Sequence, residues 1–142
     1  MSIEELVRYR IADYINRLAR LDMIYDGSSP MSRIVAVETR SVGLIVKRED
    51  GRSRLAGCDD YFIVELRRLS RGERKEVEFA LNALADVHML YVGAGFKRGV
   101  YIVMLTKDVA YIISRDEYGA YQQALPLSCL NYLFIKVLPH GC

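Results

Sequence analysis

The order in which helix-like and strand-like segments follow one another constrains the fold of this chain most strongly. Apolar residues recur at helical spacing over 3–25, alternate in extended runs over 34–39, 42–48 and 61–67, and return to helical spacing over 71–91. Strands grouped in runs favour an antiparallel sheet over a parallel one, in which strands alternate with helices. We therefore expect an α+β fold, with a largely antiparallel sheet of about five strands and helices packed on one face.

Capping and turn signals mark the ends of these segments. Ser2-Ile3-Glu4-Glu5 and Ser70-Arg71-Gly72-Glu73 have the spacing of capping boxes, which begin helices. Asp50-Gly51 is typical of a hairpin turn, because Asp and Gly accept the positive φ that such turns require. We find no internal repeat and no linker, so residues 1–142 are expected to form a single domain.

The C-terminal part of the chain gives a hairpin and two further helices. Val100–Leu105 and Val109–Ile113 predict strands that are apolar on both faces and therefore central in the sheet. Ser114-Arg115-Asp116-Glu117 has capping-box spacing and predicts a short helix to about Leu125. Segment 127–138 fits a helix or a strand, and we favour a helix. Its apolar stripe, if exposed, would be covered in a homodimer; the stripe comprises Leu127, Leu130, Phe134 and Val137.

Motifs of enzymes and metal sites are missing from the sequence. There is no P-loop, no GxSxG, no HExxH and no complete dinucleotide fingerprint. Gly93-Ala94-Gly95 begins like that fingerprint but precedes a predicted strand, whereas a dinucleotide site opens a helix. Three cysteines and two histidines lack the spacing of a zinc site. We expect a protein that is not an enzyme and that needs no cofactor or metal.

A few acidic and imidazole side chains leave an enzymatic alternative open. Asp59 and Asp60, with Glu65, have the oxygen donors that Mg²⁺ prefers, as in a small nuclease or tRNA-processing subunit. A solvated start of a strand is the simpler interpretation of that acidic pair. His88 lies on the predicted buried face of the second helix and is interpreted as a core histidine, not a general base.

Basic residues gather in the first half of the chain. Between Arg40 and Lys75 there are ten Lys or Arg residues and six Asp or Glu residues. A basic surface of this kind attracts phosphates, because binding releases condensed counterions. Arg48, Arg52 and Arg54, at the tip of the predicted hairpin, are our candidates for phosphate contacts, together with Lys97 and Arg98 further along the chain.

Aromatic residues gather near a second basic segment. Phe96 and Tyr101 lie in and after the glycine-rich loop 93–99, with Lys97 and Arg98 between them, and Tyr61 begins the third predicted strand. Aromatic platforms beside basic side chains hold unpaired bases, with roughly 1–3 kcal/mol per stacked base. The pattern predicts a protein that binds single-stranded DNA or RNA with little sequence specificity. Alternatively, the tyrosines belong to the core and keep only their hydroxyls at its rim.

The size of the chain, its aromatic-and-basic hairpin Phe96–Arg115 and its arginine-rich, amide-poor composition resemble ThermoDBP and the ThermoDBP-related proteins of archaea. The resemblance implies a heat-loving archaeal source, a cleft of exposed aromatic residues flanked by arginines, and self-association through helices. A non-catalytic scaffold or accessory subunit of an archaeal or viral assembly is the alternative. In that case the charges of segment 40–75 pair with one another.

The ends and the apolar runs of the chain bear on its location. The acidic N-terminus, Met1–Glu5, differs from the basic start of a signal peptide. No uninterrupted apolar run approaches the ~18–20 residues of a membrane helix. We expect a cytoplasmic protein with no membrane partner.

Overall fold

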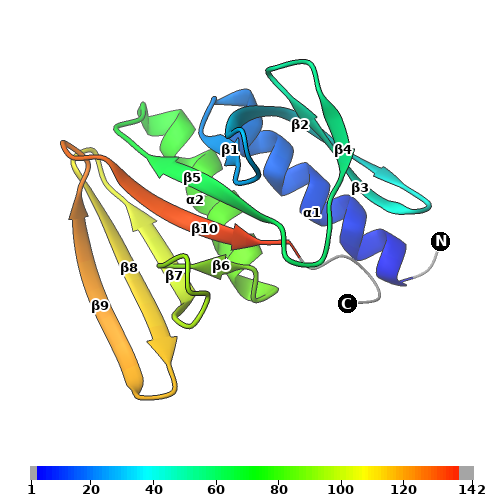
Figure 1. The fold of residues 1–142 in the computed structure, drawn as a ribbon. Helices are drawn as coiled ribbons and strands as arrows, with labels where there is room; N and C mark the ends of the chain where they lie inside the picture. The colour runs from blue at the N-terminus through cyan, green and yellow to red at the C-terminus, as the bar shows by residue number, and fades with distance from the viewer. Residues whose placement is uncertain (1–2, 138–142) are drawn as a thin grey trace.

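The computed structural model describes residues 3–137, which form two helices and one sheet (Figure 1). The helices are α1 (Ile3–Arg20) and α2 (Arg71–Asp86). The strands are β1 (Ile24–Asp26), β2 (Ser32–Arg40), β3 (Gly43–Arg48), β4 (Ser53–Leu55), β5 (Tyr61–Leu66), β6 (Leu90–Tyr91), β7 (Gly99–Leu105), β8 (Val109–Asp116), β9 (Gly119–Pro126) and β10 (Asn131–Lys136). The α+β class is confirmed, but the described sheet has ten strands and not about five.

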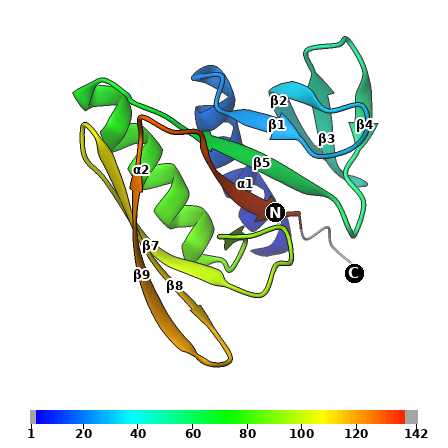
Figure 2. The same cartoon turned by 60° about the vertical axis from the view of Figure 1, so that its left-hand side comes forward.

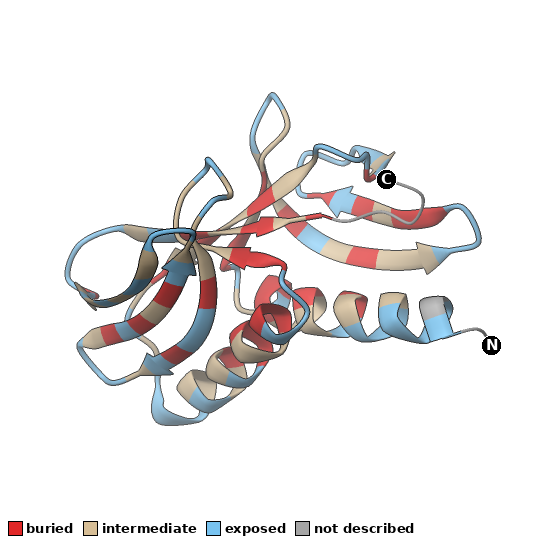
Figure 3. Cartoon of the chain, turned by 90° about the horizontal axis from the view of Figure 1, so that it is seen from below, coloured by how far each residue is buried: buried red, intermediate tan, exposed pale blue. Residues whose placement is uncertain are grey.

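The sheet is antiparallel throughout, in the order β4-β3-β2-β1-β5-β10-β6-β7-β8-β9. α1 packs on β2, α2 packs on β7, and the two helices touch each other. Figure 3 shows both helices along one side of the sheet, with buried residues alternating along the strands. We call the other side, which neither helix covers, the open face.

Local sequence explains how each helix begins and which side it buries. Ser70 caps α2: its hydroxyl accepts from the backbone N–H of Glu73, and the Glu73 carboxylate accepts from the N–H of Ser70, as predicted. The buried residues of α2 recur at helical spacing, which gives one apolar stripe toward the sheet: Val77, Ala80, Leu81, Leu84 and Ala85. Ser2, the predicted cap of α1, lies outside the described residues.

The chain contains an internal duplication, which the sequence analysis missed. Segment α1–β5 and segment α2–β10 have the same element order, and the strand orders β4-β3-β2-β1-β5 and β9-β8-β7-β6-β10 are equivalent. From β1–β3 to β6–β8 the registers match at an offset of 66 residues: Ile34 pairs with Arg48, and Val100 with Ser114. The offset is larger in the last two strands of each half, where Val46 faces Arg54 but Ile112 faces Gln123. The equivalent strands β5 and β10 pair antiparallel in the middle of the sheet, so an approximate twofold axis relates the halves (Figure 1).

The equivalence extends to single hydrogen bonds. The amide of Asn16 in α1 donates to the backbone carbonyl of Val37 at 3.0 Å and accepts from its N–H at 2.8 Å. In the second half Asn82 makes the same two bonds to Val103, at 2.9 and 2.8 Å. Each asparagine thus satisfies one backbone N–H and one carbonyl beside an irregularity in the register of β2 or β7. The neighbouring strands do not satisfy all backbone hydrogen-bonding groups there.

A short motif repeats where each helix joins its first strand. Residues 16–27 and 82–93 share the pattern Asn-x-Leu-Ala-x-x-x-Met-x-Tyr-x-Gly. In the turn after each helix, two residues beyond its end, one residue has a positive φ: Asp22 at 58° and His88 at 61°. Its N–H donates to the carbonyl of the repeated alanine in each half. The motif therefore encodes one helix end and one strand start, used twice.

The first helix is shorter than predicted, and one histidine lies elsewhere. The predicted helix 3–25 ends at Arg20, because the chain turns at Asp22 and Ile24 begins a buried strand. The second helix also ends early, at Asp86 rather than near Tyr91. His88 is exposed in the turn after it, so the prediction of a core histidine is wrong.

Two predicted C-terminal helices are strands. Segment 114–125 contains the end of β8, a turn and β9, and Ser114 is buried in β8 instead of capping a helix. Segment 127–138 contains β10, which lies between β5 and β6. Leu133 and Ile135 are fully buried there. The exposed helical stripe on which the expected homodimer depended is therefore not formed.

The predicted hairpin of β7 and β8 is confirmed, but its expected central burial is not. Figure 2 shows β7, β8 and β9 as a twisted ribbon beside α2. One face of the ribbon is buried, whereas the other exposes large apolar side chains. These are Ile102, Met104 and Tyr111. No helix within residues 3–137 is long and apolar enough to cross a membrane.

Candidate nucleic-acid interface

A row of mainly aromatic side chains crosses the middle of the sheet on its open face. Strand register places Tyr25 beside Ile63, Ile63 beside Phe134, and Phe134 beside Tyr91. Directly paired residues on neighbouring strands have their side chains on the same face, about 4.5–5.5 Å apart. We call these four residues the aromatic row. It spans β1, β5, β10 and β6 and so belongs to both halves of the duplication.

Phe96 extends the aromatic row from the glycine-rich loop. Its ring centroid lies 5.5 Å from that of Tyr91, 5.7 Å from that of Tyr61 and 6.5 Å from that of Phe134. The ammonium nitrogen of Lys136 lies 5.6 Å from the centre of the Phe96 ring, a cation–π distance. The structure thus brings the predicted residues Tyr61 and Phe96 together and places the Lys136 ammonium over Phe96. We call Phe96, Tyr61, Tyr91 and Phe134 the Phe96 cluster.

A pocket of about 290 Å³ opens beside this cluster. Its walls are mostly apolar and come from Tyr25, Met31, Ile63, Glu65, Tyr132 and Phe134. The Tyr25 hydroxyl donates to the Glu65 carboxylate at 3.4 Å, and burial together with the Glu65 charge raises the pKa of Tyr25. Among residues 3–137 Glu65 forms no ion pair. The pocket therefore combines apolar walls with the carboxylate of Glu65, which has no ion-pair partner within residues 3–137.

Basic side chains near the glycine-rich loop differ in how free they are. Lys97 is exposed and has no ion-pair partner among residues 3–137. The Arg98 guanidinium stacks on Tyr121, with its carbon 3.8 Å from the ring centre, and its Nε lies 3.9 Å from Asp116. Among the cations beside Phe96, Lys97 and Lys136 therefore have the fewest interactions with other side chains. One face of the Arg98 guanidinium is stacked on Tyr121.

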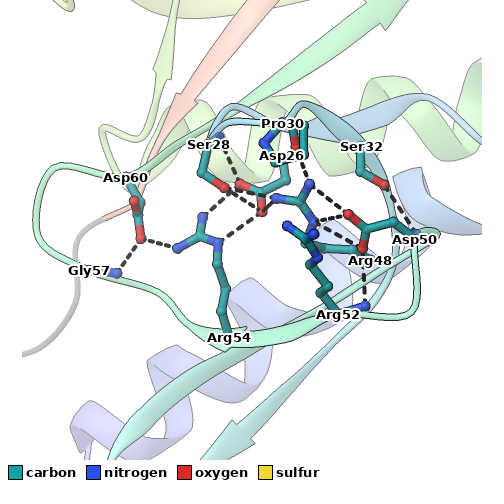
Figure 4. Close-up of polar contacts among 10 residues, drawn as sticks. All are labelled: Asp26, Ser28, Pro30, Ser32, Arg48, Asp50, Arg52, Arg54, Gly57 and Asp60. Atoms are coloured by element: carbon teal, nitrogen blue, oxygen red, sulfur yellow. Dashed lines mark hydrogen bonds and ion pairs between the residues drawn. The ribbon is translucent and has the colours of Figure 1, made fainter.

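Two of the predicted phosphate contacts, Arg48 and Arg54, are engaged inside the protein (Figure 4). Both guanidinium groups bind the fully buried carboxylate of Asp26. Arg48 Nη1 lies 2.9 Å from it, and Arg54 lies 2.9 Å from one of its oxygens and 2.6 Å from the other. Arg48 also binds Asp50 at 3.0 Å, and Arg54 binds Asp60 at 2.5 Å. We call these five residues the Asp26 network.

The Asp26 network fastens three loops to one another. Ser28 donates to Asp26 through its N–H and its hydroxyl, and Arg48 also donates to the carbonyl of Pro30. Burial alone would raise the pKa of Asp26, but the hydrogen bonds from Arg54 and Ser28 outweigh it and lower that pKa. The network is therefore a structural clamp around an ionised buried carboxylate, and its arginines are turned away from solvent.

The other two predicted residues, Arg52 and Tyr101, lie apart from the Phe96 cluster. Arg52 is exposed at the β3–β4 turn, where its backbone N–H donates to Asp50. Tyr101 is exposed at the register irregularity of β7. Among residues 3–137 neither side chain makes a ring contact or an ion pair. The structure thus divides the eight predicted residues among a clustered group, a buried network and two separate positions.

The three carboxylates of the alternative metal site, Asp59, Asp60 and Glu65, do not converge on one point. Asp60 binds Arg54 and the N–H of Gly57, Asp59 is exposed, and Glu65 faces the pocket. Within the described part of the chain no group of three or more His, Cys, Asp or Glu side chains is placed to hold a metal ion.

Half of the basic residues in segment 40–75 have carboxylate partners within residues 3–137. These are Arg40, Lys47, Arg48, Arg54 and Arg68. The number of basic residues in this segment therefore overestimates the positive charge that is available to a ligand. The cations that remain beside aromatic rings come instead from the second half of the chain.

Sequence reasoning missed several residues of the open face because it interpreted their segment as a helix. Tyr132, Phe134 and Lys136 alternate with Leu133 and Ile135, which are buried. That period of two is the signal of a strand with one covered face, and it was present in the sequence. Tyr25 was missed because the first helix was extended through it.

Comparisons with known proteins add nothing to this geometry: no family model, no curated protein and no solved structure matches the chain.

Proposed function

We propose that the open face binds single-stranded nucleic acid, with bases on the aromatic residues and phosphates on the adjacent lysines. The observation that carries this proposal is the Phe96 cluster, in which Phe96 contacts Tyr61, Tyr91 and Phe134 and lies beneath Lys136. Rings with a cation beside them form the stacking platforms of single-strand binders, because every base has a π-face and every nucleotide carries a phosphate.

The dimensions of the aromatic row suit a strand of several nucleotides. Neighbouring strands of a sheet are about 4.8 Å apart, so Tyr25 and Tyr91, three strands apart, are separated by roughly 14 Å. At the β6 end of the row Arg115 is paired with Gly99, the partner of Tyr91, whereas Arg33, beside Tyr25 at the β1 end, is ion-paired with Glu49 at 2.6 Å. A backbone crossing the sheet would meet the rings of the row and the Arg115 guanidinium at its β6 end.

The residues assigned to phosphates differ from those expected from sequence. Arg48 and Arg54 are left out, because removing them from Asp26 would leave a buried charge unpaired. Lys97 is kept from the expected set, and Lys136 and Arg115 are added. Stacking remains with Phe96 and Tyr61 and gains the aromatic row.

The test is fluorescence anisotropy with labelled oligo(dT), oligo(U) and a duplex, at low and moderate salt. We expect salt-sensitive binding to the single strands, and weaker binding for Phe96→Ala. Phe79→Ala is the matched control, because Phe79 is an exposed ring on the helix side of the protein. Absence of binding at low salt, or equal losses in the two variants, would refute the proposal.

A scaffold role is the second candidate, and one observation favours it. Ile102, Met104 and Tyr111 expose an apolar surface on β7 and β8. Exposed apolar patches mark sites of protein association. In this case Met104→Ser would disrupt capture of a partner or a second copy, whereas Phe96→Ala would leave it unchanged. The nucleic-acid proposal expects the opposite ranking for oligonucleotide binding.

A further inference from the structure

One chemical difference between the two halves of the duplication lies on the open face. Glu65 and Lys136 are equivalent, because their N–H groups donate to the carbonyls of the equivalent residues Met23 and Met89. A carboxylate in one half thus takes the place of an ammonium in the other. The fold does not require either charge, so the difference points to a ligand that is recognised asymmetrically.

The pocket in the first half is equivalent to the space that Phe96 occupies in the second. Phe96 contacts Tyr91, Phe134 and Tyr61, which the approximate twofold axis relates to Tyr25, Ile63 and Tyr132. Those three equivalents line the pocket. The first half has Pro30 at the position of Phe96, so its slot has no ring of its own. The second half therefore demonstrates, within one molecule, that this place in the fold accepts a planar aromatic ring.

Glu65 determines which ring the slot would prefer. Its carboxylate offers only acceptors, one oxygen is oriented by the Tyr25 hydroxyl, and no ion pair within residues 3–137 neutralises it. Guanine presents two adjacent donors, N1–H and the 2-amino group. Adenine and cytosine place a ring-nitrogen acceptor beside their amino group, and thymine and uracil flank a single N–H with two carbonyls. A carboxylate therefore meets repulsion on every base except guanine.

We propose that this pocket binds a guanine base of a single strand, with the ring against Tyr25, Tyr132 and Phe134 and its N1–H and 2-amino groups donating to Glu65. The inference rests on the proposed function, because Lys136 and Lys97 would hold the adjoining phosphates. It replaces the expectation of little sequence specificity with a preference at one position of the bound strand. Burial of both donors against an acceptor makes the preference stronger than stacking alone would allow.

The experiment compares oligo(dT) strands that carry one central dG, dI, dA or dC, by anisotropy at fixed salt. Deoxyinosine lacks only the 2-amino group, so it removes one of the two hydrogen bonds and leaves the ring. We expect dG to bind about tenfold more tightly than dA or dC, with dI between them, as for a bidentate base contact. Glu65→Gln should bring all four strands to one affinity. Glu76→Gln, on the exposed side of α2, is the control and should retain the preference.

The possible outcomes separate the two proposals. Equal affinity of the wild-type protein for dG and dI strands, with binding to oligo(dT) intact, would overturn the guanine inference and leave the proposed function standing. No binding to any strand would overturn both. The wild-type comparison of dG with dI needs no substitution, so it decides the inference even where Glu65→Gln does not fold.

Discussion

Replacing Asp26 with asparagine tests whether the Asp26 network is a clamp that the fold depends on. The change keeps the size of the side chain but removes its charge. Asp26 accepts from Arg48, from Arg54 at two positions and from Ser28 at two positions. An asparagine amide has one acceptor oxygen, so its NH₂ group would face a guanidinium donor.

The size of the effect follows from what remains buried. The Arg48 side chain is 3% exposed and keeps only Asp50 as a charged partner when Asp26 is neutral. Removing one member of a buried ion pair costs about 3–5 kcal/mol, since the other charge stays desolvated. We therefore expect Asp26→Asn to lower the free energy of unfolding by that amount. Asp59→Asn, an exposed acid near the same network, should change it by less than about 0.5 kcal/mol.

Urea unfolding at neutral pH, followed by circular dichroism, measures both variants. A loss below about 1 kcal/mol for Asp26→Asn would refute the clamp, because it would mean that Arg48 finds solvent or another partner easily. The combined variant Asp26→Leu, Arg48→Met, Arg54→Met should regain most of the lost stability. The second half of the protein already has Val92, Ser114 and Gln123 at the equivalent positions and folds without this network.

Three other predictions concern the two equivalent asparagines, the titration of Asp26 and the charge of Lys136. Asn16→Ala and Asn82→Ala should each cost about 1–3 kcal/mol in urea unfolding, because each leaves two backbone groups unpaired; widely different losses would contradict the equivalence of the halves. Because the folded-state pKa of Asp26 is lowered, its contribution to stability is complete above the unfolded value near 4 and is lost as pH falls through the folded value. Acid titration of unfolding should therefore show a smaller loss in the Leu/Met/Met variant. Lys136→Ala should reduce the slope of log K against log salt for oligo(dT) by about 0.7, as for one phosphate contact on a single strand; an unchanged slope would remove Lys136 from the site.

Local signals correctly predicted a hairpin turn and a helix cap. The Asp50-Gly51 turn joins β3 to β4, with Gly51 at a φ of 87°, and Ser70 caps α2. These features depend on a few neighbouring residues, which the sequence displays directly. The antiparallel order also followed from the grouping of strands, since grouping reflects how neighbours pair.

Signals that depend on distant partners were misinterpreted. Ser114 to Glu117 has the spacing of a capping box, but pairing of β8 with β9 puts Ser114 in a buried strand position. Segment 131–136 pairs with β5 and β6 and is a strand. Its alternation of buried and less buried positions was a local signal, but the helical spacing of Leu127, Leu130 and Phe134 competed with it. Propensity is a weak prior against such pairing.

The candidate site was predicted in part. Phe96 and Tyr61 were identified because aromatic and basic residues occur together in the sequence, and the structure places the two rings in contact. Arg48 and Arg54 were misassigned because charge counting does not reveal which arginine has a buried carboxylate beside it. The duplication went unnoticed because most equivalent positions changed identity while keeping their burial.

The position of β10 has a consequence for how the chain matures. β10 is the last strand of the described residues, yet it lies in the middle of the sheet and is the strand through which the two halves pair. During synthesis β5 and β6 would emerge long before it, each with an unpaired edge and apolar side chains beside it. Such edges invite pairing with other chains. The nascent protein would therefore be most prone to aggregation until β10 leaves the ribosome.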